Sequence, residues 1–86
     1  MANLPESILT TTFMVNGRKL KLDTAKIPSR LGGYTYETML LDPNANELDV
    51  AYGKTVDEGI ENHYRLHKKY ERIFGLGSVI IEKEEN

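Results

Sequence analysis

Residues 55–74 read TVDEGIENHYRLHKKYERIF, and this stretch decides the fold. Apolar side chains recur in it at helical spacing, which predicts a helix over residues 56–74 with one apolar face and one charged face. Thr55 and Glu58 form a capping box, in which the hydroxyl and the carboxylate each accept a hydrogen bond from a free backbone N–H. Gly75 is a natural terminator. We therefore expect one long amphipathic helix packed on another element.

Two histidines lie on the apolar face of this helix. Its central row comprises Val56, Ile60, His63, His67, Tyr70 and Phe74, with Leu66 and Ile73 beside it. His63 and His67 stand one turn apart, a spacing at which two imidazoles can bind one zinc ion. Because the chain has no cysteine, a third ligand would have to be a carboxylate from the sheet, such as Glu37 or Asp49. Nothing in the sequence indicates that either carboxylate lies beside the histidines. We interpret both histidines as packed, hydrogen-bonded residues and predict no metal and no cofactor.

A β-hairpin is predicted upstream of the helix, over residues 13–22. Asn16-Gly17 between two extended runs is typical of a type I′ turn. In that register one face carries Phe13, Val15, Leu20 and Leu22, and the other carries Thr12, Met14, Lys19 and Lys21. Residues 23–33 contain one proline and two glycines and show no clear period, so we expect an irregular connector there.

A second hairpin and a short last strand complete the expected sheet. The hairpin has one strand from Tyr34 to Leu41, a turn over residues 42–46 and a partner strand from Glu47 to Tyr52. In the partner strand Leu48, Val50 and Tyr52 alternate with other residues, so we expect these three to face the core. Residues 78–82 are predicted to form the final strand.

These elements define an α+β fold, with two antiparallel β-hairpins, a short C-terminal strand and one long amphipathic helix packed on the sheet. A length of 86 residues suits a single domain over residues 1–86. The start of the chain lacks the layout of a signal peptide, and no apolar run is long enough for a membrane span. With no cysteine, the chain fits a reducing cytoplasm, and we predict no membrane association.

No catalytic motif is found in the sequence. The G-x-G at residues 75–77 follows a helix and lacks the third glycine of a dinucleotide loop. The carboxylate pair of Glu47 and Asp49 lies on one strand face, where charge normally serves solubility and edge protection. The serines have no nucleophile motif around them. We therefore expect no enzyme activity and infer no small-molecule substrate.

Basic side chains gather on the first hairpin. Arg18, Lys19 and Lys21 could contact phosphate as a β-ribbon, which gives a nucleic-acid-binding module as a third functional hypothesis. The net charge of −2 argues against general nucleic-acid binding, because that affinity comes largely from clustered cations.

Tyrosines and the last strand indicate a protein-contact surface. The chain has five tyrosines, more than a core of this size needs, and a tyrosine at an interface can use both its ring and its hydroxyl. The run at residues 79–81 is apolar on both faces and so needs cover on both. We predict a homo-oligomer or a complex with another protein, with contacts at Tyr34, Tyr36, Tyr64, Val79, Ile80 and Ile81.

Residues 34–70 also carry a recognisable pattern. It consists of YETMLL at residues 36–41, GKTVDEG at residues 53–59 and Asn62-His63. This pattern resembles small, uncharacterised bacteriophage and prophage accessory proteins, in which a YETM strand and a second strand lead to a helix that starts T-x-E-E-A and carries a Gly-His pair. Here Gly59 replaces the alanine and Asn62 the glycine. The resemblance implies a phage origin and supplies no catalytic residues.

Together these observations favour a phage-type accessory protein that binds a host factor or its own copies without catalysis. It would act in the cytoplasm of a bacterial host. The alternative is a structural component of a phage particle, which would place the chain in the virion.

Overall fold

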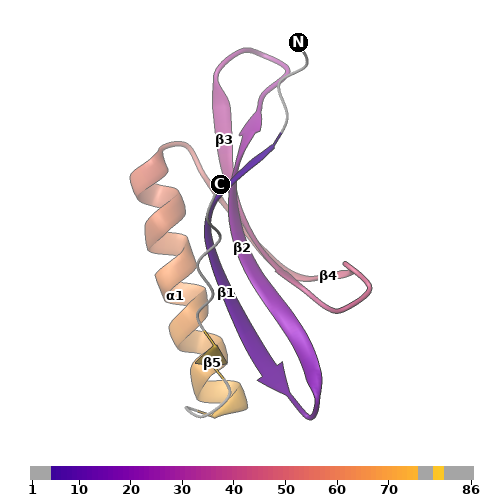
Figure 1. Ribbon diagram of the computed structural model, residues 1–86. Coiled ribbons are helices and arrows are strands. Elements are labelled where there is room, and N and C mark those ends of the chain that lie inside the picture. Colours follow the sequence, from indigo (N-terminus) through magenta and orange to yellow (C-terminus); the bar gives the residue numbers. More distant parts are fainter. Residues whose placement is uncertain (1–4, 76–78, 81–86) are drawn as a thin grey trace.

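The computed structural model describes residues 5–75 and 79–80 and confirms the α+β fold. In chain order the elements are β1 (Glu6–Val15), β2 (Arg18–Pro28), β3 (Tyr34–Leu41), β4 (Glu47–Gly53), α1 (Val56–Phe74) and β5 (Val79–Ile80). The strands form one antiparallel sheet in the order β4-β3-β2-β1-β5. Helix α1 packs along one face of this sheet (Figure 1).

The first hairpin has the predicted turn and register. Asn16 and Gly17 have φ angles of 51° and 79°, as a type I′ turn requires. Phe13 pairs with Leu20 across the two strands.

The prediction of an irregular connector is wrong for residues 23–28. These residues continue β2, which pairs with β1 on one side and with β3 on the other. Only the turn around residues 29–33 is irregular, and the hairpin that it closes extends past the start of α1 (Figure 1). The period is hidden because the buried side chains of this segment include the polar residues Asp23 and Thr24.

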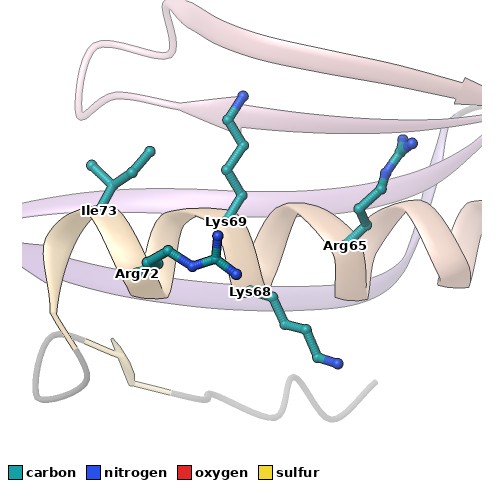
Figure 2. A pocket seen from close by; sticks show the side chains of 5 residues that line it. All are labelled: Arg65, Lys68, Lys69, Arg72 and Ile73. Carbon is teal, nitrogen blue, oxygen red and sulfur yellow. The ribbon is translucent and has the colours of Figure 1, made fainter.

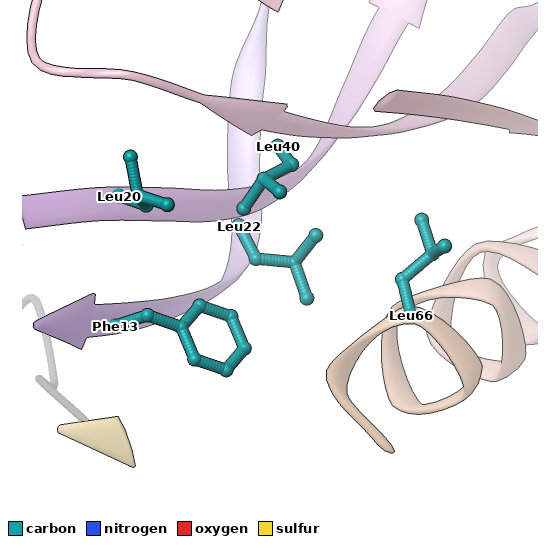
Figure 3. Packing of buried hydrophobic residues seen from close by; sticks show 5 residues of the cluster. All are labelled: Phe13, Leu20, Leu22, Leu40 and Leu66. Carbon is teal, nitrogen blue, oxygen red and sulfur yellow. The ribbon is translucent and has the colours of Figure 1, made fainter. Parts of the chain in front are cut away.

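The core lies between the sheet and α1. Its fully enclosed apolar side chains come from three strands and from the helix, and Figure 3 shows them converging: Phe13, Leu20, Leu22, Leu40 and Leu66. Phe74 and Tyr70 pack against this cluster from the last turns of α1. Ile73 points away from it and is exposed.

The expected orientation of β4 is wrong. Asp49 and Ala51 face the helix, while Val50 and Tyr52 lie on the other side of the sheet, and Leu48 sits in an irregular step of the pairing with β3. Asp49 is hydrogen-bonded to the helix, since the Tyr70 hydroxyl donates to its Oδ2 atom at 2.6 Å. This hydrogen bond is the main cause that lowers the pKa of the Asp49 carboxyl.

Helix α1 starts as the capping box predicts, with one difference. The backbone N–H of Glu58 donates to the Thr55 hydroxyl at 3.1 Å, as expected. The Glu58 carboxylate, however, accepts from the backbone N–H of Lys54 at 2.7 Å and not from that of Thr55. The first bond satisfies an N–H that the helix start leaves free, and the second fixes the residue that precedes the cap.

Two glycines allow the helix start to approach the sheet closely. A Cβ atom added at Gly59 would lie 2.9 Å from the Cβ of Tyr36 and 3.3 Å from the Cγ2 of Thr24. One added at Gly53 would lie 2.9 Å from the Cβ of Glu58. This contact brings the first turns of α1 down onto β2 and β3.

Strand β5 closes the sheet beside β1. Phe13 pairs with Val79 and Thr12 with Ile80. The predicted final strand is therefore present at residues 79–80, and Ile81 lies outside the described residues.

Candidate functional site

A buried chain of polar side chains occupies the core beside the first turns of α1. His63 has no exposed surface, and its Nδ1 and Nε2 atoms lie 2.8 Å from the Thr24 hydroxyl and 2.9 Å from the Thr11 hydroxyl. Thr24 and Thr38 are 2.7 Å apart through their Oγ1 atoms, and Thr38 donates to the carbonyl of Gly59 at 3.4 Å. The interpretation of His63 as a packed, hydrogen-bonded residue is confirmed.

The chain of hydrogen bonds runs in one direction. Because the only proton of the Thr38 hydroxyl goes to the Gly59 carbonyl, Thr38 must accept from Thr24. Thr24 must then accept from Nδ1 of His63, and Nε2 must accept from Thr11. His63 is thereby held as the neutral tautomer with its proton on Nδ1.

Burial, together with the smaller effect of the neighbouring His67, lowers the pKa of His63 to about 4. The imidazole is neutral at pH 7 and both of its nitrogens are occupied. The imidazole is enclosed and its nitrogens are hydrogen-bonded to threonines, so a substrate could not reach it. We interpret this network as a structural part of the core.

The second histidine has a different environment. His67 packs edge-on against the ring of Phe13 at 5.7 Å, and its Nε2 lies 3.5 Å from a carboxylate oxygen of Glu71. Within residues 5–75 and 79–80, no cluster of three metal-ligating side chains forms.

The sheet face opposite α1 is the candidate binding surface. No described helix or strand covers it, and it is named the open face below. Five rows of cross-strand neighbours run across it: Met14 with Lys19; Thr12 with Lys21, Leu41 and Glu47; Thr10 with Asp23, Met39 and Val50; Ser7 with Ala25, Glu37 and Tyr52; and Ile27 with Thr35. Apolar side chains occur in every row.

Tyr52 is the most exposed aromatic residue of the open face, with 65% of its surface accessible. Met39, Leu41 and Val50 are half-buried around the middle of the face. A sheet face that carries such side chains and is covered by no described element is typical of a surface that contacts another molecule. The sequence signal for the open face is the alternation of Val50 and Tyr52 with polar residues in β4, from which these two side chains were expected to face the core.

Charged groups of both signs lie on the open face. Lys19, Lys21 and Glu47 lie on the half nearer the Asn16-Gly17 turn, and Asp23 and Glu37 lie on the other half. Asp23 is buried, and its Oδ1 atom accepts from the hydroxyls of Ser7 and Thr10, both at 2.9 Å.

The outer edge of β4 is partly closed. The backbone N–H of Val50 donates to the Oδ1 atom of Asp49 at 2.8 Å, and the backbone carbonyl of Tyr52 accepts from the Asn62 side chain at 3.2 Å. Both are main-chain groups that an added strand would need. The face of the sheet is therefore a better contact surface than this edge.

The predicted partner-binding tyrosines do not lie on the open face: Tyr34 and Tyr36 are neighbours on the other face of β3, and Tyr64 is on α1. Tyr34 is near the tip of the β2-β3 hairpin, with the ammonium of Lys26 4.1 Å from its ring centre. Tyr36 lies beneath Gly59, and Tyr64 is exposed on α1. Val79 and Ile80 are in β5 at the other end of the sheet, where the structure describes their pairing only.

The predicted phosphate-contacting residues are divided between faces. Lys19 and Lys21 line a shallow groove of about 400 Å³ on the open face, together with Leu41 and the turn after β3. Arg18 pairs with Val15 and belongs to the opposite face. Asp42 also lines the groove, but its carboxylate accepts hydrogen bonds from Asn44 and Asn46 within its own turn.

A second basic surface lies on the outer side of α1. It is a groove of about 500 Å³ lined by Arg65, Lys68, Lys69, Arg72 and Ile73 (Figure 2). Lys69 is paired with Asp49 at 3.1 Å, and Arg65 donates to Asn62. The sequence placed these cations on the solvent side of the helix, as observed.

Comparison with protein-family models, with curated proteins and with solved structures returned no match. The described part of the chain contains no helix with the length and apolar character needed to cross a bilayer. The function therefore has to be inferred from the geometry above.

Proposed function

We propose that this chain is a protein-binding module that acts without catalysis, in the manner of the small phage accessory proteins that it resembles. The observation that carries the proposal is the open face, an apolar and charged sheet surface that no described helix or strand covers. Its partner would be bound through Tyr52, Val50, Met39 and Leu41.

Two further features support binding over chemistry. The histidine most deeply placed in the molecule, His63, has both nitrogens occupied by threonines and is enclosed by the core. Asp49, the carboxylate that faces α1, is occupied by Tyr70 and Lys69. These groups hold the fold together, whereas Tyr52 is exposed on the open face and Met39, Leu41 and Val50 are only half-buried there.

The test compares two matched substitutions of exposed tyrosines. Tyr52→Asp places a charge on the open face, and Tyr64→Asp makes the same change on α1, where 54% of the tyrosine surface is accessible. Each tagged chain is used to isolate bound proteins from bacterial cells, untagged copies of the chain included. Each captured protein is then purified and titrated against all three chains by calorimetry.

We expect Tyr64→Asp to bind like the wild type and Tyr52→Asp to lose at least tenfold in affinity, because the charge would have to be buried on binding. Equal binding by Tyr52→Asp would overturn the assignment to the open face. A loss confined to Tyr64→Asp would place the contact on α1 instead.

A further inference from the structure

We infer that the groove on the outer side of α1 binds a short acidic segment of a partner protein. This groove, called the α1 groove below, is lined by side chains from the second half of the helix: Arg65, Lys68, Lys69, Arg72 and Ile73 (Figure 2). It is formed by α1 and is separate from the open face, so the inference goes beyond the proposed function.

Positive charge dominates the α1 groove. Lys68 and Arg72 are exposed, and neither side chain forms a hydrogen bond or an ion pair with any residue that the structure describes. Arg65 donates to a neutral amide side chain, which leaves its charge without compensation. Lys69 is paired with Asp49 at 3.1 Å. Three of the four cations can therefore attract a negatively charged ligand.

The surroundings of the α1 groove favour an acidic protein segment over a nucleic acid. The first turns of the same helix carry Asp57, Glu58 and Glu61, all exposed, so a long polyanion lying along α1 would meet carboxylates as well as cations. The chain as a whole has a net charge of −2. Affinity for nucleic acid comes from many cations acting on many phosphates, whereas a short acidic segment needs only the cations of the groove.

Ile73 gives the α1 groove an apolar contact. It is the one apolar side chain among those that line the groove, and 59% of its surface is accessible. A protein segment that carries an apolar side chain next to its carboxylates can cover Ile73 and pair with the cations at the same time. A phosphate backbone has no apolar group to place there.

The spacing of Lys68 and Arg72 fits an extended segment. The two residues are four positions apart, which is a rise of about 6 Å along a helix. In an extended chain, side chains two positions apart point to the same side and are separated by roughly 6.5–7 Å. Two carboxylates with one residue between them can therefore pair with Lys68 and Arg72 together.

The test uses the full chain and two synthetic peptides. In the acidic peptide every second residue is glutamate and the others are leucine and glycine, and the neutral peptide has glutamine in place of each glutamate. Fluorescence anisotropy of the labelled peptides is measured with the wild type, Lys68→Glu and Arg72→Glu. Lys19→Glu makes the same charge change at an exposed lysine of the open face and is the matched control.

We expect the wild type to bind the acidic peptide with a dissociation constant of roughly 100 μM at about 20 mM salt, because exposed ion pairs are weak and are screened by salt. Lys68→Glu and Arg72→Glu should each weaken binding at least about fivefold, and Lys19→Glu by less than about twofold. The neutral peptide should not bind. Absence of binding at about 1 mM acidic peptide, or an equal loss in Lys19→Glu, would overturn the inference.

A second pair of variants tests the apolar contact. Ile73→Ala and Leu48→Ala each shorten an exposed apolar side chain, but only Ile73 lines the α1 groove. Ile73→Ala should weaken binding of the acidic peptide about two- to threefold, and Leu48→Ala should leave it unchanged. Equal effects of the two variants, or tighter binding of a thymidine oligonucleotide of the same charge, would overturn the assignment to a protein segment. Any of these failures leaves the binding proposed for the open face standing, because that proposal is tested at Tyr52.

Discussion

His63 connects the helix to three threonines of the sheet through one chain of hydrogen bonds, in which each donor and acceptor is fixed. The sequence indicated a hydrogen-bonded histidine, since His63 lies on the central row of the apolar face. Its partners were not predicted, although Thr11 and Thr24 are on the core-facing side of their strands. Threonine suits strands on either face, so its presence alone does not show that it is buried.

The first prediction concerns the pH dependence of stability. His63 has a pKa of about 4 in the folded chain against 6.5 for the ordinary group. Between these values the unfolded chain binds a proton at His63 that the folded chain does not bind. The free energy of unfolding should therefore decrease by about 3 kcal/mol as the pH falls from 6.5 to 4, and this contribution should not change further below that window.

Proton NMR of the imidazole ring tests this directly, without a variant. The ring signals of His63 should stay constant from neutral pH to below pH 5. A midpoint near 6.5 would show that the side chain is accessible to water and that the polar network does not enclose it.

Ala45 offers a second prediction at this scale. It has a φ angle of 63°, which costs an L-residue roughly 1–2 kcal/mol but costs glycine little. Ala45→Gly should raise the free energy of unfolding by up to about 1 kcal/mol, the gain being reduced by the greater freedom of glycine in the unfolded chain. Ala45→Val should lower it. Urea denaturation of both variants checks the prediction, and the reverse order of stability would contradict it.

Among the elements, the helix was predicted accurately and the strands only in part. Helix α1 has the expected bounds because its cap, its period and its terminator agree with one another. Strand β2 was predicted too short because its second half places polar residues inside. In β4, Asp49 is a charged residue on the core side, held by a tyrosine from α1 that no pattern within the strand reveals.

Gly59 yields a prediction for the packing of α1 on the sheet. In an isolated helix, alanine is more favourable than glycine by about 1 kcal/mol. Here the added Cβ would stand 2.9 Å from the Cβ of Tyr36, an atom fixed to the backbone of β3. Gly59→Ala should therefore lower the free energy of unfolding by roughly 1–3 kcal/mol.

Thermal denaturation of Gly59→Ala provides the measurement, with Glu61→Ala on the exposed side of the same helix as its control. Glu61→Ala should change stability by less than about 0.5 kcal/mol. An increase in stability for Gly59→Ala would mean that helix propensity dominates and that α1 can move away from β3.

For the whole molecule, the small number of enclosed apolar side chains limits stability. Leu22 has no exposed surface and comes from the central strand of the sheet. Leu22→Ala should lower the free energy of unfolding by about 2–5 kcal/mol, a large share of the 5–15 kcal/mol typical of a domain. Chemical denaturation would show this as a lower midpoint, and a change below about 0.5 kcal/mol would mean that the core is elsewhere.

The overall layout could be predicted because local signals place each turn and the helix. The side of the sheet left open could not be predicted, because that depends on how the strands face α1. An error of one position in β4 moves Tyr52 from the core to the open face. A sequence pattern with apolar residues on both sides of a strand does not decide between the two assignments.

The order of the strands also determines how the chain can fold. From β1 to β4 each strand pairs with its neighbour in sequence, so the sheet can grow by successive closure of short loops. Such closures cost little entropy and permit folding on a timescale of milliseconds or faster. The pairing of β1 with β5 instead joins the two ends of the chain. This pairing should form last, after α1 has docked on the growing sheet, and should be the first to open when the protein unfolds.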